Sequence, residues 1–333
     1  MFEVDDHYGP YYSADNLDCI IGMYTGRNAN LIDQVRDDIE GSRFGHTYDV
    51  VADVTGDGVS DIFAGNRVHP STQANQNTHV FRIDGGTFEI IDELANLRGH
   101  PDLSSDEVLS VGDSALRTLG DVNKNGSEDV MIRLCLDALS GDECGILVVD
   151  GFTLEPLYEY SDPQANVDFA NLMLPAGDID DDGFPDMALF TRSDYAFYTS
   201  RPQGVSVIGD GHPALDGRLP EIGTDSLVEV SRQQLGINTS NVELGREALL
   251  LLSRERRTTT LTNGARVLVP GQILRTHAAQ DGPFVNAKID LPLPQDPRCL
   301  GETVYVQWVI PEQGPAGGLH FAASRLLELT LLP

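Results

Sequence analysis

Three nine-residue segments share one arrangement of oxygen-bearing side chains, with glycine at the sixth position and aspartate at the ninth. They begin at Asp53, Asp121 and Asp178. Oxygen side chains at positions 1, 3 and 5 of a tight turn converge on one point, and the glycine lets the backbone bend sharply, as in loops that bind Ca²⁺. The pattern therefore predicts three Ca²⁺-binding loops.

Each loop is expected to supply side-chain oxygens at positions 1, 3, 5 and 9 and the main-chain carbonyl of position 7. The predicted ligands are Asp53, Thr55, Asp57, Val59 and Asp61 in the first loop, Asp121, Asn123, Asn125, Ser127 and Asp129 in the second, and Asp178, Asp180, Asp182, Phe184 and Asp186 in the third. Position 12, where an EF-hand carries a bidentate glutamate, is apolar in all three loops, so the ninth-position aspartate is expected to close the shell. Because affinity follows ligand charge, the third loop should bind most tightly and the second most weakly.

The segments beside the loops are short apolar runs of strand length rather than amphipathic helices. Such runs occur before the loops at 48–52, 115–119 and 172–176, and after them at 62–65, 130–134 and 187–190. In the first two units a further apolar run follows and ends in an Asp-Gly turn, at residues 84–85 and 150–151. Each unit is therefore predicted as a strand, a Ca²⁺ loop and a second strand.

This unit resembles the FG-GAP repeat, the blade unit of integrin alpha-chain propellers and of many secreted bacterial proteins. Phe44-Gly45 supplies the opening dipeptide of the first clear copy. The resemblance implies an all-β fold with an FG-GAP-type β-propeller over residues 1–210, small, open or truncated, with about four blades. The blades are expected at approximately 1–43, a degenerate copy, and at 44–108, 109–165 and 166–210.

Residues 211–333 are predicted to form a C-terminal β-sandwich. The acidic loops stop there, and six apolar runs separated by Pro and Gly turns follow, at 227–230, 248–252, 266–269, 285–291, 303–309 and 326–331. In the run at 303–309, apolar residues occupy both odd and even positions, which indicates burial on both faces of a strand. Another pair of diverged blades is the alternative for this region.

The chain has 333 residues, with 52 Asp and Glu against 22 Lys and Arg, so its formal net charge is −30. This balance argues against binding to nucleic acid or to an anionic membrane surface. Hydrophobic residues make up 41% of the chain, enough for a substantial core. No apolar run approaches the roughly 18 to 20 residues of a membrane span, so no membrane insertion is expected. The first residues show neither the basic nor the apolar region of a secretory leader.

The four cysteines form no zinc-binding pattern. Cys135 and Cys144 bracket a turn-rich segment between two apolar runs, so they can face each other across a hairpin, as a disulfide or as two free thiols. Cys19 and Cys299 are far apart in sequence and are interpreted as small buried hydrophobic residues.

The sequence predicts a protein that is not an enzyme. It contains no nucleophile elbow, zinc-protease helix or phosphate-binding glycine loop, and its acidic loops are spaced to wrap an ion, as structural metal sites do. Up to three structural Ca²⁺ ions of extracellular-type affinity indicate an extracellular or cell-surface protein that binds or adheres to an unknown protein or carbohydrate ligand. Two alternatives remain: an enzyme active on polysaccharide that uses the propeller as a scaffold or carbohydrate-binding module, and a structural surface or matrix protein.

Overall fold

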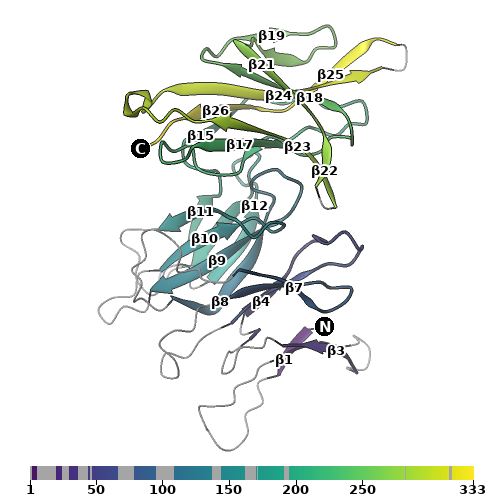
Figure 1. Cartoon of the computed structure of the whole chain (residues 1–333), viewed down its shortest axis with the longest axis vertical. Coiled ribbons are helices and arrows are strands. Elements are labelled where there is room, and N and C mark those ends of the chain that lie inside the picture. The colour runs from purple at the N-terminus through teal and green to yellow at the C-terminus, as the bar shows by residue number, and fades with distance from the viewer. Residues whose placement is uncertain are drawn as a thin grey trace, which may run out of the picture. The chain divides into compact units, whose positions relative to one another are not determined.

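The computed structural model describes residues 2–5, 20–24, 30–36, 44–45, 47–66, 79–94, 109–136, 144–161, 170, 172–190, 195–281, 283–314 and 317–333. In these ranges the regular elements are β-strands and one 3-10 helix, Pro297–Cys299. The strands form seven sheets, none of which closes on itself within the described residues (Figure 1). The predicted all-β class is confirmed, whereas closure into a propeller is not shown.

The chain divides into two compact units. The first comprises Met1–Leu119, Glu128–Pro175 and Met187–Tyr198, and the second comprises Gly120–Ser127, Ala176–Asp186 and Thr199–Pro333. The second and third acidic loops therefore belong to the same compact unit as the C-terminal residues, apart from Glu128 and Asp129, the eighth and ninth positions of the second loop. In the described part of the chain, no helix has the length and hydropathy of a membrane span.

The first four sheets each pair strands that follow one another along the chain. Their strands are β1 (Phe2–Asp5), β2 (Ile20–Tyr24) and β3 (Leu31–Val35), then β4 (Thr47–Val50), β5 (Ile62–Gly65), β6 (Val80–Ile83) and β7 (Ile90–Leu94), then β8 (Leu109–Gly120), β9 (Asp129–Leu136), β10 (Cys144–Val149) and β11 (Pro156–Ser161), and finally β12 (Leu172–Gly177), β13 (Asp186–Phe190) and β14 (Tyr195–Thr199). One such meander lies within each of the four predicted repeats.

The acidic loops connect strands, not helices. They join β4 to β5, β8 to β9 and β12 to β13, and the Asp-Gly turns join β6 to β7 and β10 to β11. The register of β4 with β5 pairs Val50 with Ile62 at the loop end of the hairpin. The strands expected on both sides of every acidic loop are therefore present, and a helix-flanked EF-hand is excluded.

The Phe44-Gly45 dipeptide has a packing role in the first unit. Phe44 is fully buried, and its ring meets that of Phe81 edge to face at a centroid distance of 5.3 Å. The same cluster contains Ile21 from β2 and Ile62 from β5, so the first and second sheets share one hydrophobic core. Gly45 has a φ of +72°, a backbone conformation that favours glycine.

The second and third sheets are linked by hydrogen bonds within the first unit. Asp49 of β4 accepts from the main-chain N–H of Thr118 of β8 at 2.9 Å. Arg82 of β6 donates to the carbonyl of Gly151, in the turn after β10, at 3.1 Å. Successive repeats are thus joined by polar side chains as well as by apolar packing.

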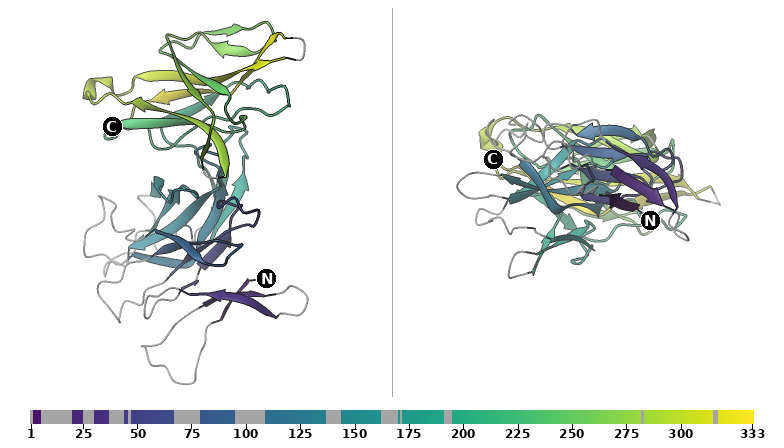
Figure 2. Two further views of the ribbon diagram at one scale, coloured as in Figure 1. Left: turned by 45° about the vertical axis from the view of Figure 1, so that its right-hand side comes forward. Right: turned by 90° about the horizontal axis from the view of Figure 1, so that it is seen from below.

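In the second unit, strands that are distant in sequence pair with one another. Its strands are β15 (Val205–Ile208), β16 (Gly223–Thr224), β17 (Gln234–Thr239), β18 (Glu247–Ser253), β19 (Thr258–Thr260), β20 (Arg266–Leu268), β21 (Gln272–His277), β22 (Ala279–Asp281), β23 (Phe284–Pro292), β24 (Thr303–Gln313), β25 (Leu319–Ala323) and β26 (Leu326–Thr330). These strands are the green to yellow part of the ribbon in Figure 2. A six-stranded sheet has the order β15-β26-β24-β18-β21 with β25 beside β24, a four-stranded sheet has the order β16-β17-β23-β22, and β19 pairs with β20. This order is not a meander, in contrast to that of the first four sheets.

Trp308 ties the two larger sheets together. It lies on β24, is fully buried, and donates its indole N–H to the carbonyl of Asn238 on β17 at 3.0 Å. On the other face of the six-stranded sheet, Val309 packs with Val267 of the β19-β20 hairpin. Burial on both faces of the strand at 303–309 is therefore confirmed.

Two strand predictions differ from the structure. The run at 227–230 is not a strand, because only Glu229 forms an isolated bridge, to Leu332. β15 lies in the range predicted for the fourth blade, yet it pairs with β26 of the six-stranded sheet. Both segments are short, and their partners come from the end of the chain, which local sequence does not reveal.

Cys144 is disulfide-bonded, and its Cα is paired with that of Cys135 across the β9-β10 hairpin. This register is the one that the predicted disulfide requires. Cys299 is free and only partly buried, in contrast to the expectation of a buried residue. Cys19 lies outside the described residues.

Candidate metal centre

The three acidic loops make the same internal hydrogen bonds. In the third loop Asp178 accepts from the main-chain N–H groups of Asp182, at 2.9 Å, and Gly183, at 2.8 Å. Asp53 and Asp121 accept from the fifth and sixth residues of their own loops in the same way. The first-position aspartate therefore stabilises each turn by accepting hydrogen bonds from the main chain of the same loop.

The backbone explains the glycine at the sixth position. Its φ is +90° at Gly58, +100° at Gly126 and +93° at Gly183, where a Cβ atom would be strained. The fourth position is also left-handed, even where it is not glycine, at Lys124 (+60°) and Asp181 (+57°). The loops thus share one backbone path, as their common sequence pattern predicts.

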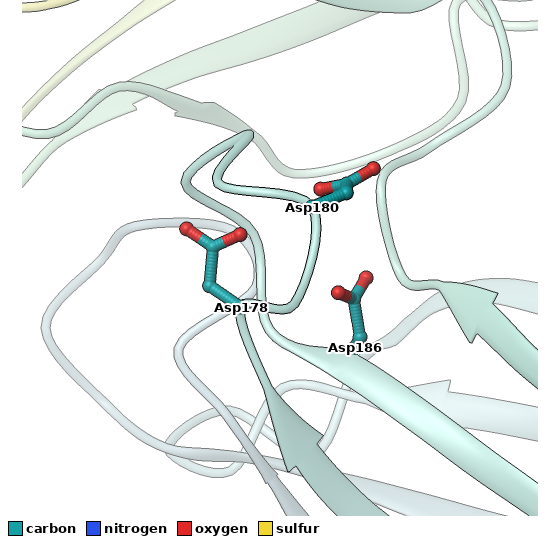
Figure 3. A group of neighbouring side chains, drawn as sticks. All are labelled: Asp178, Asp180 and Asp186. Carbon is teal, nitrogen blue, oxygen red and sulfur yellow. The ribbon is translucent and has the colours of Figure 1, made fainter.

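The third loop gathers three carboxylates. One oxygen each from Asp178, Asp180 and Asp186 lies within 4.8 Å of the others (Figure 3). Asp186 is only 4% exposed; its Oδ2 accepts from Ile179 N at 2.7 Å, whereas its Oδ1 is buried without a hydrogen-bond partner. A buried carboxylate oxygen is costly unless a donor or cation meets it. This cluster can hold a metal ion, and a bound cation would supply the partner that Asp186 Oδ1 lacks.

The corresponding oxygen is occupied in the other two loops. Asp61 Oδ1 accepts from Gly85 N at 2.9 Å, and Asp129 Oδ1 accepts from Gly151 N at 3.2 Å. Both glycines belong to the Asp-Gly turns after the third strand of the repeat. The sequence after β14 has no Asp-Gly pair at that place, which explains why Asp186 differs.

Asp182, a predicted ligand, lies outside the three-carboxylate cluster. Its Oδ1 accepts from Phe184 N, and its Oδ2 forms an ion pair with Arg201 at 2.8 Å. Burial raises the pKa of Asp182, with Asp180 and Asp178 adding to the rise and the Phe184 N–H and Arg201 opposing it. The sequence indicated four converging carboxylates, and the structure pairs one of them with an arginine that lies beyond β14.

The carboxylates of the first loop are engaged by main-chain N–H groups. Asp61 Oδ2 accepts from Val54 and Thr55, and Asp57 Oδ1 accepts from Val59. Burial acts to raise the pKa of Asp53, but hydrogen bonds from the loop, that of Gly58 foremost, outweigh it and lower the pKa below its ordinary value. In the part of the chain that the structure describes, this loop does not form a three-carboxylate cluster of the kind seen in the third.

The second loop is held by amide side chains of the second unit. The carbonyl of Asn123 accepts from Asn238 Nδ2 at 3.0 Å, and that of Asn125 accepts from Asn286 Nδ2 at 3.0 Å. Gly223 lies so close that an added Cβ would be 2.6 Å from the Asn123 carbonyl oxygen. This loop is therefore positioned against β16, β17 and β23.

Asp121, at the start of the second loop, has a raised pKa. Burial raises its pKa to about 7, although Lys124 and the N–H groups of Gly126 and Asn125 oppose the rise. Between about pH 4 and pH 7 the Asp121 carboxyl is therefore protonated in the folded state, whereas in the unfolded state, where its pKa is about 4, it has released the proton. In chelator, this group should make the free energy of unfolding fall as the pH rises from about 4 to about 7.

Urea unfolding at several pH values tests this expectation, with Asp121→Asn as the control that removes the titrating group. The free energy of unfolding of the wild type, minus that of the variant, should decrease as the pH rises. Identical pH profiles for the two proteins would contradict it. Added Ca²⁺ should reduce the slope, because an ion competes with the proton at the carboxylate.

The sequence prediction missed two contributors to these loops. One is Arg201, which has no counterpart in the repeat pattern. The other is the contact made by the turn after β6 and β10: the sequence predicted an Asp-Gly turn there, but not that its glycine donates to the acidic loop. In these turns Asp84 and Asp150 each accept two main-chain N–H groups. The signal was present, since residues 84–89 and 150–155 share an Asp-Gly start, a threonine at the fourth place and a glutamate at the sixth.

No protein-family model matches the chain, and no curated protein matches it. Among solved structures, the chain is similar to one from a study of the host cell surface retention of a 1.5-MDa bacterial ice-binding adhesin. The identity is 10%, the TM-score is 0.23, and the match covers 86% of this chain and 98% of that chain. A TM-score this low carries no argument about fold or function, and membership of the FG-GAP family is not confirmed.

Proposed function

We propose that this chain is a non-catalytic, extracellular Ca²⁺-binding repeat protein that acts as a binding or adhesion module. Residues 1–210 would form the FG-GAP-like repeats and residues 211–333 the β-sandwich, with a protein or carbohydrate as the ligand. The observation that carries the proposal is the cluster of Asp178, Asp180 and Asp186 with its orphaned buried oxygen.

The chemistry of the cluster favours Ca²⁺. Its donors are all hard oxygens, with no imidazole or thiolate that would favour zinc, and the loop carbonyls are further oxygen donors of the kind that Ca²⁺ uses. Without a cation, three carboxylates this close repel one another. An ion bound there links the end of β12 to the start of β13, so its role is structural.

We rank the third loop as the tightest site, the first next and the second weakest. The third loop has the converging carboxylates and the unpartnered Oδ1 of Asp186. In the first loop both oxygens of Asp61 accept N–H bonds. The second loop has only two aspartates, and two of its main-chain carbonyls already accept from asparagine amides.

Thermal melting of the full chain in 1 mM Ca²⁺, in EGTA and in 1 mM Mg²⁺ tests the proposal. If the ion is tenfold above its dissociation constant, linkage contributes about 1.4 kcal/mol, which raises Tm by roughly 3 to 6 °C. Mg²⁺ should have a smaller effect, because it holds its water shell more strongly. Equal Tm values in Ca²⁺ and in EGTA would remove the basis of the proposed function.

A further inference from the structure

The second unit contains an apolar cavity of about 860 Å³ between its two larger sheets. Leu252 and Val304 line it from the six-stranded sheet, Leu235 and Leu291 from the four-stranded sheet, and Leu293 from the segment after β23. None of the side chains that line it is aromatic. Packed protein interiors do not tolerate voids of this size, whereas binding sites of about 300 to 1,000 Å³ are common.

The cavity reaches the edges of two strands. It is lined by residues 272, 274 and 275 of β21 and by residues 289 to 292 of β23. Because neighbouring side chains of a strand point to opposite faces, a cavity on one face alone would be lined only by alternate residues. Lining by adjacent residues therefore indicates that the cavity meets both strands edge-on.

These two edges have no strand partner among the described residues. β21 ends the six-stranded sheet and pairs only with β18. β23 pairs with β22 at residues 284–286, but its last six residues, 287–292, pair only with β17. A strand edge of this kind presents unpaired N–H and C=O groups that can pair with a further strand.

Charges of opposite sign flank the cavity. The Arg275 side chain on β21 is 70% exposed, and the Asp290 side chain on β23 is 52% exposed. Their partners, Glu247 at 3.3 Å and Lys288 at 3.6 Å, are also exposed, so these pairs are weak and can be exchanged. Residues 211–333 carry 13 acidic and 11 basic side chains, against 39 and 11 in residues 1–210, so the strong negative charge of the repeats is absent here.

We propose that this cavity docks an extended peptide segment of another protein, which adds as a strand to the free edge of β21 or β23. The segment has about six residues, the number left unpaired on β23, with aliphatic side chains at alternate positions that enter the cavity. An acidic residue beside Arg275 and a basic residue beside Asp290 complete it. An acyl chain would fill the space but leave both edges unpaired, and a sugar would find no aromatic surface to stack on.

The probe is a fluorescein-labelled octapeptide in which valine alternates with threonine between a terminal glutamate and a terminal lysine. Fluorescence anisotropy with the full chain should show saturable binding. The same peptide N-methylated at alternate residues keeps its apolar surface but loses its ladder hydrogen bonds, and should bind at least about tenfold more weakly. Palmitate should not displace the labelled peptide.

Matched variants test the position of the site. Arg275→Glu should weaken binding about threefold or more, and a peptide with glutamate and lysine exchanged should recover it. Arg218→Glu, at a half-exposed arginine outside the cavity, should have no effect. Leu274→Trp should block the cavity, and circular dichroism checks that this variant folds.

Five results would overturn the proposal: no saturable binding, equal affinity for the N-methylated peptide, displacement by palmitate, the same loss in Arg218→Glu as in Arg275→Glu, or dimerisation that the peptide does not reverse. Displacement by palmitate would identify a lipid cavity instead. Dimerisation that the peptide does not reverse, measured by analytical ultracentrifugation, would assign the site to a second copy of this chain. Because none of these readouts depends on a metal ion, they can fail independently of the Ca²⁺ proposal.

Discussion

Asp186→Asn is expected to abolish most of the stabilisation by Ca²⁺. The side chain is 4% exposed and supplies the only buried, unpartnered carboxylate oxygen among the described residues. At a hundredfold excess of Ca²⁺ over its dissociation constant, the lost linkage is about 2.7 kcal/mol. In EGTA the variant should be at least as stable as wild type, because the amide removes one of three mutually repelling charges and keeps an oxygen for the N–H of Ile179.

Asp182→Asn is the matched control in the same loop. Its carboxylate pairs with Arg201, so the substitution should lower Tm to a similar extent in Ca²⁺ and in EGTA. Calorimetric titration of Ca²⁺ into both variants separates the two effects, since only Asp186→Asn should lose a binding event. A full Ca²⁺ response in Asp186→Asn, or none in Asp182→Asn, would contradict the assignment of the site.

The local features of the repeats could be predicted from the sequence. Alternation of apolar runs with acidic turns fixes where strands and hairpins lie, and the glycine at the sixth position of each loop reports a left-handed φ that few other residues adopt. These signals act over about ten residues. They are repeated three times, which made the common backbone of the loops predictable.

Contacts between distant segments could not be predicted in this way. Arg201 reaches Asp182 over 19 residues, and Gly85 reaches Asp61 over 24. Arg201 has no counterpart in the repeat pattern, and the recurring Asp-Gly turns do not reveal that their glycines reach the acidic loops. These partners nevertheless decide which carboxylate oxygens remain free. The ranking of the three loops therefore rests on long-range contacts as much as on ligand charge.

For residues 211–333 the all-β class was predicted from the sequence, but the strand order was not. β17 contains Gly236 and polar residues, which weaken its strand signal, yet it pairs with β23 along its whole length. The run at 227–230 has a stronger strand signal but finds only one bridge. In this unit, whether a segment forms a strand depends on the pairing partner that is available to it, and not on its strand propensity alone.

Trp308→Ala is expected to lower the free energy of unfolding of the second unit by about 3 to 5 kcal/mol. The ring is fully buried between the six-stranded and four-stranded sheets, and its loss also leaves the carbonyl of Asn238 without its donor. Trp308→Phe keeps most of the volume and should cost less. Urea unfolding followed by circular dichroism measures both, and Phe197→Ala, at a side chain that is 68% exposed, should change stability by less than about 0.5 kcal/mol.

Trp308 is the only tryptophan of the chain, so its fluorescence in the wild type reports the unfolding of the second unit. The third acidic loop belongs to that unit, and Arg325, directly before β26, donates to the carbonyl of Asp181 in the loop at 2.8 Å. Ca²⁺ bound at Asp178, Asp180 and Asp186 should therefore shift the fluorescence transition to higher temperature. A shift seen by circular dichroism but not by Trp308 fluorescence would place the ion in the first loop, because that loop lies wholly in the first unit.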